Sequence, residues 1–308
     1  MGRSGFRAGV QAAAVALVLV ATAAEGRKPP GAAEVRALVA AHARALAAKD
    51  ADAAKASFAA DALVWLPTST KLAATPDEIV RGLDDSWFSR VDGPDRVVAK
   101  DVKIGGLGAD AAWVSALLEM SGTYEGADAP VGKRYAYAVH MTALARKEGG
   151  AWKLAVAHYS EAIPGKRAVE HVARREVEPL APIPGGIPVG ETDQAAAWLA
   201  SPAELAAHLS RDPATVLVGS SPGEKAVGAA KAGRMLGTWK KVKLAVSGPV
   251  RELRGEGWLV VAAHLDSPVH TGDGDVTVEY RALVIFVGDP ATGFAAAAVH
   301  YATPSVIF

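Results

Sequence analysis

The sequence contains no cysteine, carries no net charge and has few aromatic residues. Without cysteine, disulfides, thiol nucleophiles and cysteine-based metal sites are excluded. The 33 basic residues balance the 33 acidic ones, so we expect neither nucleic acid nor an anionic membrane as a partner. Aromatic residues make up only 6% of the chain, and much of its hydrophobic half is alanine. Because alanine buries little area, the few large apolar side chains must anchor the cores.

Residues 10–20 form a largely apolar run near the N-terminus, preceded by Arg3 and Arg7 and followed by an Ala-Thr-Ala sequence at 21–23. This order is typical of a secretory signal peptide. The run is shorter than the roughly 20 residues that a membrane-spanning helix requires. We therefore expect residues 1–24 to be a signal peptide, and the protein to be periplasmic or secreted with no membrane contact after cleavage. The alternative is an uncleaved N-terminal anchor.

The same order of landmarks occurs twice along the chain, at an offset of about 145 residues. Each copy has a capped helix start, a strand that opens on tryptophan and a final histidine–tyrosine pair. These landmarks are residues 75–82, Trp113 and His158-Tyr159 in the first copy, and residues 221–228, Trp258 and His300-Tyr301 in the second. A repeated order at a near-constant offset indicates two copies of one domain. The predicted boundaries are 32–162 for domain 1, 163–192 for a Pro/Gly-rich linker and 193–303 for domain 2.

Within each copy, the apolar spacing predicts helices followed by four antiparallel strands. In the first copy, a helix starts near Val35 and carries His42 on its apolar stripe, a short second helix spans 53–58, and a third begins at Thr75 with a capping-box pattern. We expect that third helix to run to residue 91. The predicted strands are 96–104, 111–120, 133–146 and 151–160 in the first copy, and 240–253, 258–266, 276–287 and 294–301 in the second. The predicted helices of the second copy are 195–199, 202–209 and 222–236.

This arrangement resembles the SnoaL-like and ketosteroid-isomerase-like branch of the nuclear-transport-factor-2-like superfamily. The likeness is carried by the opening helix, the Phe-Ala-Ala-Asp-Ala-Leu-Val-Trp-Leu-Pro run at 58–67, the helix start at 76–82, the strand from Trp113 and the final strand at 152–159. The resemblance implies the α+β class, with two cone-shaped domains, each made of helices packed in a strongly curved antiparallel sheet. The open end of each cone would be an apolar pocket. Members of this family commonly dimerise through the sheet, so the resemblance also implies an intramolecular pseudo-dimer.

The sequence departs from the catalytic pattern of that family at one informative position. Isomerase-type members have a carboxylate directly before a proline on the short strand after the second helix, and this chain has Leu66 before Pro67. The second copy has an apolar Val-Leu-Val run at 216–218 in the corresponding place. Leucine has no proton to exchange, so proton-shuttle isomerisation by the familiar route is disfavoured.

Three residues of the first copy are candidates for other catalysis. If the face of the last strand that carries Trp152 is concave, alternation directs His158 toward the pocket, where it could act as a base. Glu119 and Tyr135, on the neighbouring strands, would support it. The alternative is that His158 is a buried packing residue and Glu119 a solvent-facing charge at a strand end.

Candidate ligand contacts are the large aromatic residues of the first copy and one histidine. We predict Trp65, Trp87, Trp113 and His140 as ligand-binding residues at the mouth of the cone. The alternative is that these tryptophans simply fill the core.

Five potential metal ligands lie within twelve residues of the second copy: His264, Asp266, His270, Asp273 and Asp275. Such residues can hold zinc or calcium, but the Ser-Pro and Thr-Gly-Asp-Gly sequences among them are typical of a turn-rich hairpin loop. No fixed-spacing motif supports a metal site. We therefore predict neither a metal nor a cofactor.

The resulting functional hypothesis is an exported tandem SnoaL-like protein without enzymatic activity, which binds a small apolar molecule or a protein partner. The alternative is a SnoaL-like lyase, isomerase or hydrolase in domain 1 that uses a histidine–carboxylate pair. A polar cavity around His158 would favour the enzyme, whereas a filled cone would favour binding.

Overall fold

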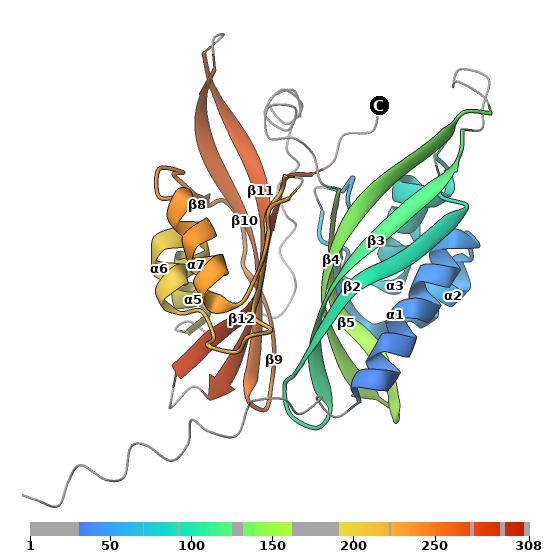
Figure 1. Ribbon diagram of the computed structural model, residues 1–308, viewed down its shortest axis with the longest axis horizontal. Coiled ribbons are helices and arrows are strands. Elements are labelled where there is room, and N and C mark those ends of the chain that lie inside the picture. Colours follow the sequence, from blue (N-terminus) through green and yellow to red (C-terminus); the bar gives the residue numbers. More distant parts are fainter. Residues whose placement is uncertain are drawn as a thin grey trace, which may run out of the picture.

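The structure is a computed structural model, which describes residues 31–69, 71–90, 93–124, 132–161, 191–221, 223–271, 274–289 and 293–304. The expected signal peptide at 1–24 and all but the end of the expected linker at 163–192 lie outside the described residues. The described chain is of the mixed α+β class and contains two curled sheets (Figure 1). We refer to residues 31–161 as the first lobe and to residues 191–304 as the second lobe.

The first lobe places three helices on one side of a five-stranded sheet (Figure 1). Its elements are α1 (Ala32–Ala47), α2 (Ala51–Ala56), β1 (Phe58–Trp65), α3 (Pro76–Leu83), the π-helical turn η1 (Asp84–Phe88), β2 (Arg96–Gly106), β3 (Ala111–Thr123), β4 (Arg134–Glu148) and β5 (Ala151–Glu161). The strand order is β1-β5-β4-β3-β2, and β1 runs parallel to β5. The four predicted meander strands are therefore confirmed.

The second lobe has a similar order of elements. They are α5 (Glu191–Ala200), α6 (Pro202–Ala207), β6 (Val216–Val218), β7 (Lys225–Val227), α7 (Ala229–Thr238), β8 (Ala245–Val246), β9 (Arg251–Gly255), β10 (Trp258–Thr271), β11 (Gly274–Asp289) and β12 (Gly293–Ala302). The sheet order is β7-β6-β12-β11-β10-β8, with β9 also paired to β10. Here too the first strand, β6, runs parallel to the last, β12.

The helix predicted from Thr75 forms, but it ends earlier than expected. The Thr75 hydroxyl accepts a hydrogen bond from the Glu78 backbone N–H at 3.3 Å, and the Glu78 carboxylate accepts one from the Thr75 N–H at 3.1 Å, which confirms the capping box. The α-helix stops at Leu83 and continues only as the π-helical turn η1, in which the Ser89 N–H donates to the Asp84 carbonyl. This wider turn buries Trp87 completely.

Two predicted elements of the second lobe differ from the structure. The helix predicted over 222–236 begins only at Ala229, because residues 225–227 pair with β6 as β7 and Gly228 adopts a positive φ of 87°. The strand predicted over 240–253 is divided into β8 and β9. Between them lies Pro249, which has no backbone N–H to offer a sheet.

The two sheets face each other, and the helices cover their outer sides (Figure 1). One hydrophobic cluster extends from α1 through the first sheet to Val260, Leu283 and Ile285 on the facing side of the second sheet. A second cluster lies between the second sheet and its own helices, around Leu199, Leu236 and Phe286. The lobes therefore share a buried apolar interface, and the second lobe also has an interior cluster of its own. Within the described ranges, no helix has the length and apolar character needed to span a membrane.

A glycine lies under a tryptophan at equivalent places in both sheets. Gly105 pairs with Trp113, and Gly255 pairs with Trp258. A Cβ atom added to Gly105 would lie 2.1 Å from the Trp113 indole, and one added to Gly255 would lie 2.3 Å from the Trp258 indole. The missing side chains thus leave room for both indole rings.

We expect Gly105→Ala to lower the free energy of unfolding by about 1–3 kcal/mol, because the buried Trp113 ring must move. The matched control is Gly237→Ala in α7, where nothing lies within 4 Å of an added Cβ. That change should raise the stability by about 0.5–1 kcal/mol, because alanine loses less backbone freedom on folding. Chemical denaturation of both variants checks the pair. A Gly105→Ala variant as stable as wild type would show that the close approach to Trp113 is unimportant.

Candidate functional site: a polar cluster between the sheets

The densest group of buried polar side chains lies where the two sheets meet. We call it the interlobe cluster; its members are His140, Thr142, His158 and Ser160 of the first lobe and His264, Glu279, Arg281 and His300 of the second. All eight are buried. Polar side chains in such a place need internal partners, because water does not reach them.

His158 on β5 and His300 on β12 form the centre of this cluster. Their rings stack with centroids 4.0 Å apart and an interplanar angle of 26°, and both side chains are fully buried. The His300 Nε2 atom is hydrogen-bonded to the Ser160 hydroxyl at 2.7 Å. Neither ring nitrogen of His158 has a hydrogen-bond partner among the described residues. His158 therefore packs against the second lobe.

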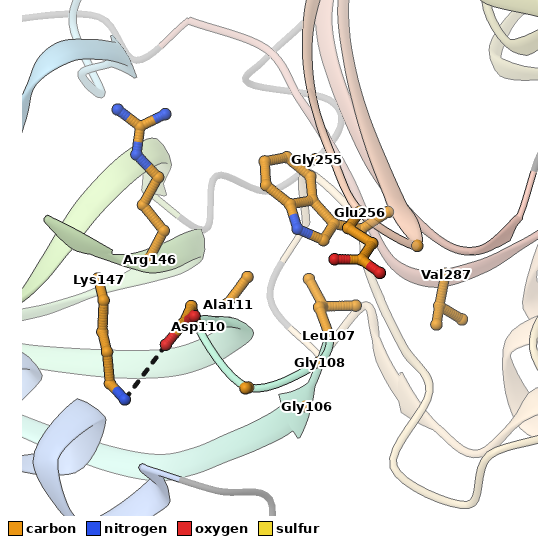
Figure 2. A pocket seen from close by; sticks show the side chains of 13 residues that line it. Gly106, Leu107, Gly108, Asp110, Ala111, Arg146, Lys147, Gly255, Glu256 and Val287 are labelled. Carbon is orange, nitrogen blue, oxygen red and sulfur yellow. Dashed lines mark ion pairs between the residues drawn. The ribbon is translucent and has the colours of Figure 1, made fainter.

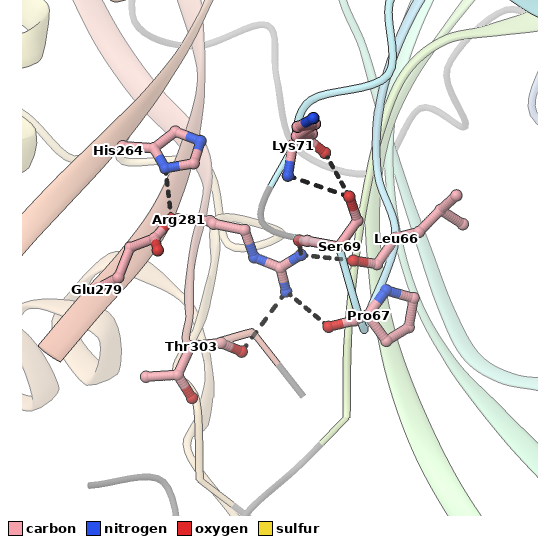
Figure 3. Close-up of polar contacts among 8 residues, drawn as sticks. All are labelled: Leu66, Pro67, Ser69, Lys71, His264, Glu279, Arg281 and Thr303. Carbon is pink, nitrogen blue, oxygen red and sulfur yellow. Dashed lines mark hydrogen bonds and ion pairs between the residues drawn. The ribbon is translucent and has the colours of Figure 1, made fainter. Parts of the chain in front are cut away.

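Arg281 on β11 joins the second lobe to the first through backbone oxygens (Figure 3). Its fully buried guanidinium donates to the carbonyls of Leu66 and Ser69 from Nη1, the latter at 2.8 Å. Nη2 donates to the carbonyls of Pro67 and Tyr159 at 3.4 Å and of Thr303 at 3.5 Å. A planar guanidinium suits such a divided set of acceptors, because its N–H groups point in fixed directions. One side chain thus holds the segment that follows β1.

A buried histidine–carboxylate pair lies beside Arg281. The His264 Nδ1 atom is 2.6 Å from a carboxylate oxygen of Glu279, and both side chains are at most 5% exposed. Trp65 of the first lobe contacts both His264 and His158, at ring-centroid distances of 5.3 and 5.2 Å. The pair is therefore closed off from solvent by the tryptophan.

Burial controls the protonation of the histidines in the cluster. It lowers the pKa of His158 well below its usual range, and His300, Arg281 and His264 lower it further. Burial, His140 and Arg281 have the same effect on the pKa of His300. Burial, assisted by Lys225, lowers the pKa of His140 to about 4. At neutral pH these three rings are uncharged.

The predicted catalytic residues are not brought together. Glu119 forms an ion pair with Lys100 at 2.7 Å on the exposed part of β3. By strand spacing and rise, its backbone lies roughly 16 Å from that of His158, with β4 between them. Tyr135 points to the opposite side of the sheet, where its hydroxyl donates to the Gly93 carbonyl at 2.6 Å. The expected acid/base arrangement of His158, Glu119 and Tyr135 is absent from the described residues.

A β-bulge explains why His158 faces away from the helices. The register between β4 and β5 shifts between Leu144 and Ala145, so strict alternation along β5 fails. Trp152 consequently lies against Gly31 at the start of α1, on the helix side of the sheet. His158 lies on the other side, and the prediction that it shares a face with Trp152 and points into the first-lobe pocket was wrong.

The predicted ligand-binding residues also lie in separate places. Trp65 and His140 belong to the interlobe region, and Trp113 covers Gly105 on the same side of the sheet. Trp87 lies among the helices and packs edge-on against Tyr159, with centroids 5.4 Å apart. These four residues do not surround a common cavity.

Buried side chains line the helix-facing side of the sheet in the first lobe. Leu66 packs against Gly82 of α3. The Tyr159 hydroxyl is hydrogen-bonded to His42 Nε2 at 2.8 Å, and both side chains are fully buried. Burial lowers the pKa of His42 to about 4 and raises the pKa of Tyr159 above its ordinary value, so both groups are neutral at pH 7.

The potential metal ligands at 264–275 do not lie together in the structure. His264 is paired with the buried Glu279, whereas His270 is paired with Asp275 at 2.8 Å on the surface. Asp273 lies outside the described residues. Among the residues that are described, no group of three histidine, aspartate or glutamate side chains could hold a metal ion.

An open cleft of about 680 Å³ lies where the β2–β3 and β9–β10 turns of the two lobes meet (Figure 2). Arg146 and Lys147 line its first-lobe wall, and Glu256 and Val287 line the opposite wall. Lys147 is paired with Asp110 at 3.3 Å, and Arg146 is paired with Asp61 and Glu148. Leu107, Trp258 and Val287 supply the apolar part of the lining. This volume lies within the range of about 300–1,000 Å³ that is usual for small-molecule sites.

Arg281 and Glu279 were missed by the sequence reasoning, although the sequence contains a signal for them. Both alternate with Leu283 and Ile285 along β11, so two charges share a strand face with two large apolar residues. Such a face is buried in an apolar environment, and its charges require specific partners. The partner of Glu279, His264, lies 15 positions away, whereas the acceptors of Arg281 include Leu66, 215 positions away.

Comparison with known proteins identifies the fold of the first lobe. Residues 35–164 match the family model of the SnoaL-like domain, which is less than half of the chain. The first lobe thus has a SnoaL-like fold, and this match does not decide between an enzymatic and a ligand-binding role. No curated protein matches the chain.

Several solved structures are similar to part of the chain. A ketosteroid isomerase-like protein from Erwinia carotovora atroseptica has 25% identity and a TM-score of 0.37, over 44% of this chain and 98% of its own. A proposed dehydratase of the NTF2-like family from Streptomyces avermitilis has 17% identity and a TM-score of 0.37, over 42% and 96%. An NTF2-like protein of unknown function from Prochlorococcus has 20% identity and a TM-score of 0.34, over 42% and 91%.

Proposed function

We propose that the protein is an exported, non-enzymatic binding protein, in which two SnoaL-like units are joined back to back. The observation that carries this proposal is the burial of the candidate base: His158 is fully buried against His300, and Leu66 stands in place of a carboxylate. A general base must reach the proton that it removes, and an imidazole enclosed between two sheets cannot reach a substrate. The non-enzymatic hypothesis is therefore favoured over the lyase, isomerase or hydrolase.

Equivalent contacts in the two lobes support a tandem origin and an intramolecular pseudo-dimer. Tyr159 packs edge-on against Trp87 at 5.4 Å and 85°, and Tyr301 packs on Trp239 at 5.4 Å and 89°. His158 and His300, the corresponding histidines, touch each other. Contact between equivalent residues is what a twofold interface produces. On this basis the two domains span residues 32–162 and 193–303, each as a cone of helices in a curved sheet.

The ligand that we propose is a small apolar molecule bound in the cleft between the lobes. The charged residues Arg146 and Lys147 already have carboxylate partners, and Leu107, Trp258 and Val287 form the apolar part of the lining. A small aromatic molecule fits the apolar part of this lining. A protein partner at the same cleft is the second outcome to be tested.

The test is a fluorescence titration of the full chain with 1-anilinonaphthalene-8-sulfonate, an aromatic probe with one sulfonate. We expect Ala109→Trp, which places a large ring in the cleft, to weaken binding about tenfold or more, a loss of about 1.4 kcal/mol. The control Ala33→Trp lies on an exposed part of α1 and should bind like wild type. His158→Phe should retain the affinity within about twofold. Equal binding of the probe by the Ala109→Trp variant and the wild type would contradict the cleft as the site. An enzymatic turnover that the wild type performs and a folded His158→Phe variant does not would contradict the non-enzymatic role.

A further inference from the structure

The centre of the sheet–sheet interface contains a stacked pair of histidines whose ring nitrogens largely lack hydrogen-bond partners among the described residues. The imidazoles of His158 and His300 come from different lobes, and their rings are stacked 4.0 Å apart. Several of their polar atoms have no hydrogen-bond partner in the described part of the chain: both ring nitrogens of His158 and the Nδ1 atom of His300. The pair is thus held by ring contact and by the Ser160 bond, and neither ring has a carboxylate beside it.

The other ionisable groups that face this pair are mostly cations or potential cations. They are His140 from β4, His264 from β10, and Glu279 and Arg281 from β11; Lys225 from β7 acts on His140. The one carboxylate among them, Glu279, is already bonded to His264 at 2.6 Å. Arg281 carries a permanent positive charge, because its guanidinium does not lose its proton in proteins. A proton added to His158 or His300 therefore enters a buried region with no free negative charge among the described residues.

We propose that the sheet–sheet interface is an acid-sensitive joint, in which protonation of His158 and His300 drives the two lobes apart. In the closed form, two charged imidazoles in contact would repel each other in a medium of low dielectric constant. In the open form, each ring takes up its proton in water. Acid thus favours the open form, and the folded lobes carry the rings away from each other.

Apolar burial keeps the joint closed at neutral pH. The same interface contains Val260, Leu283 and Ile285, which would meet water if the lobes separated. Arg281 adds hydrogen bonds to the Leu66–Ser69 segment of the first lobe. The stabilisation from apolar burial and from the Arg281 hydrogen bonds changes little with pH in the acid range. The free energy by which histidine protonation favours the open form grows as the pH falls.

The sign of the pH effect follows from the direction of the pKa shifts. In the closed form the pKa of His158 and of His300 lies well below the usual 6.5, and opening returns each toward that value. Above about pH 6.5 neither form binds these protons, so the equilibrium is independent of pH. Below it the open form binds more protons, and each histidine multiplies the opening constant about tenfold per pH unit. The two together give about 100-fold per unit, and about 1,000-fold at pH 5.

The absence of cysteine makes the distance between the lobes easy to measure. Arg44→Cys on α1 and Lys231→Cys on α7 are exposed positions on the outer helices, and a spin label on each reports the separation. Double electron–electron resonance distances are recorded from neutral pH to about pH 4, with far-UV circular dichroism in parallel. We expect the distance to increase cooperatively while the helix and strand signals persist. Loss of both signals in a single transition would overturn the proposal, because it would mean global unfolding.

The variant that tests the sensor is His158→Phe combined with His300→Phe, which keeps two aromatic rings but removes both titrating groups. We expect its opening at pH 5 to be suppressed about 1,000-fold. His42→Phe is the matched control: its ring is also buried, and its pKa is also lowered to about 4, but it lies among the helices of the first lobe. The control should open like the parent protein. Opening of the double variant at the parental pH would overturn the proposal.

A measurement on the parent protein covers the case in which the double variant does not fold. The ring C–H resonances of His158 and His300 report their protonation by nuclear magnetic resonance. We expect both rings to stay neutral well below pH 6.5 and to gain protons in the same pH interval as the distance change. Protonation of both rings with the lobes still closed would overturn the proposal.

Discussion

Replacement of Arg281 by methionine is expected to lower the free energy of unfolding by about 3–5 kcal/mol. The fully buried guanidinium donates hydrogen bonds to carbonyl groups from three separate segments of the chain. Methionine fills a similar volume but donates no hydrogen bond. The carbonyls of Leu66, Pro67 and Tyr159 would then remain buried without this donor, at a cost of about 1–3 kcal/mol for each group that water cannot reach. Denaturant unfolding followed by tryptophan fluorescence measures the loss.

Two further substitutions show whether geometry or charge is responsible. Arg281→Lys keeps the charge but offers one ammonium group, which cannot reach acceptors on both sides, so we expect more than half of the loss to remain. Arg254→Met removes a half-exposed arginine whose partner is Glu252 in the same sheet, and it should cost less than about 1 kcal/mol. A loss below about 1 kcal/mol for Arg281→Met would mean that the interlobe contact does not contribute to stability.

The second large effect is expected for Trp87→Ala, at about 3–5 kcal/mol. Trp87 is fully buried in η1 and packs edge-on against Tyr159, so its removal leaves a cavity between the helices and the sheet. The neighbouring backbone cannot collapse freely, because η1 is tied to α3 and to Ser89. Thermal and denaturant unfolding of the variant measure the change.

Trp239→Ala is the matched comparison for this prediction. Trp239 makes the same edge-on contact with Tyr301 at 5.4 Å, but its side chain is only partly buried. Its loss should therefore cost clearly less than that of Trp87, since less apolar surface is removed from the interior. If Trp87→Ala retained wild-type stability, the interior of the first lobe would be an open pocket, and the enzymatic alternative would regain support.

Local patterns predicted the elements of the first lobe well. The Thr75–Glu78 capping box and the hairpin between β4 and β5 depend on a few neighbouring residues, and both are confirmed. The errors occur where local preference is overridden. The helix from Thr75 ends in a π-helical turn that buries Trp87, and residues 225–227 join the edge of a sheet although they resemble part of a helix.

The candidate site was harder to predict, because its geometry depends on a bulge and on the other lobe. Strict alternation along β5 placed His158 on the wrong side of the sheet. The register shift between β4 and β5 at Leu144 and Ala145 has no recognisable sequence pattern. The environment of His158 is made by His300 and Arg281, more than 100 residues away. The ion pair between Glu119 and Lys100 could not be predicted from the sequence either, because it depends on the register between β2 and β3.

The reach of Arg281 across 215 residues affects the order in which the chain acquires its final structure. When the first lobe leaves the ribosome, the segment after β1 still lacks the Arg281 donor, because β11 has not yet been made. Distant contacts form late, because a long loop must close first. The N-terminal half would therefore remain a loosely finished intermediate until the C-terminal strands arrive.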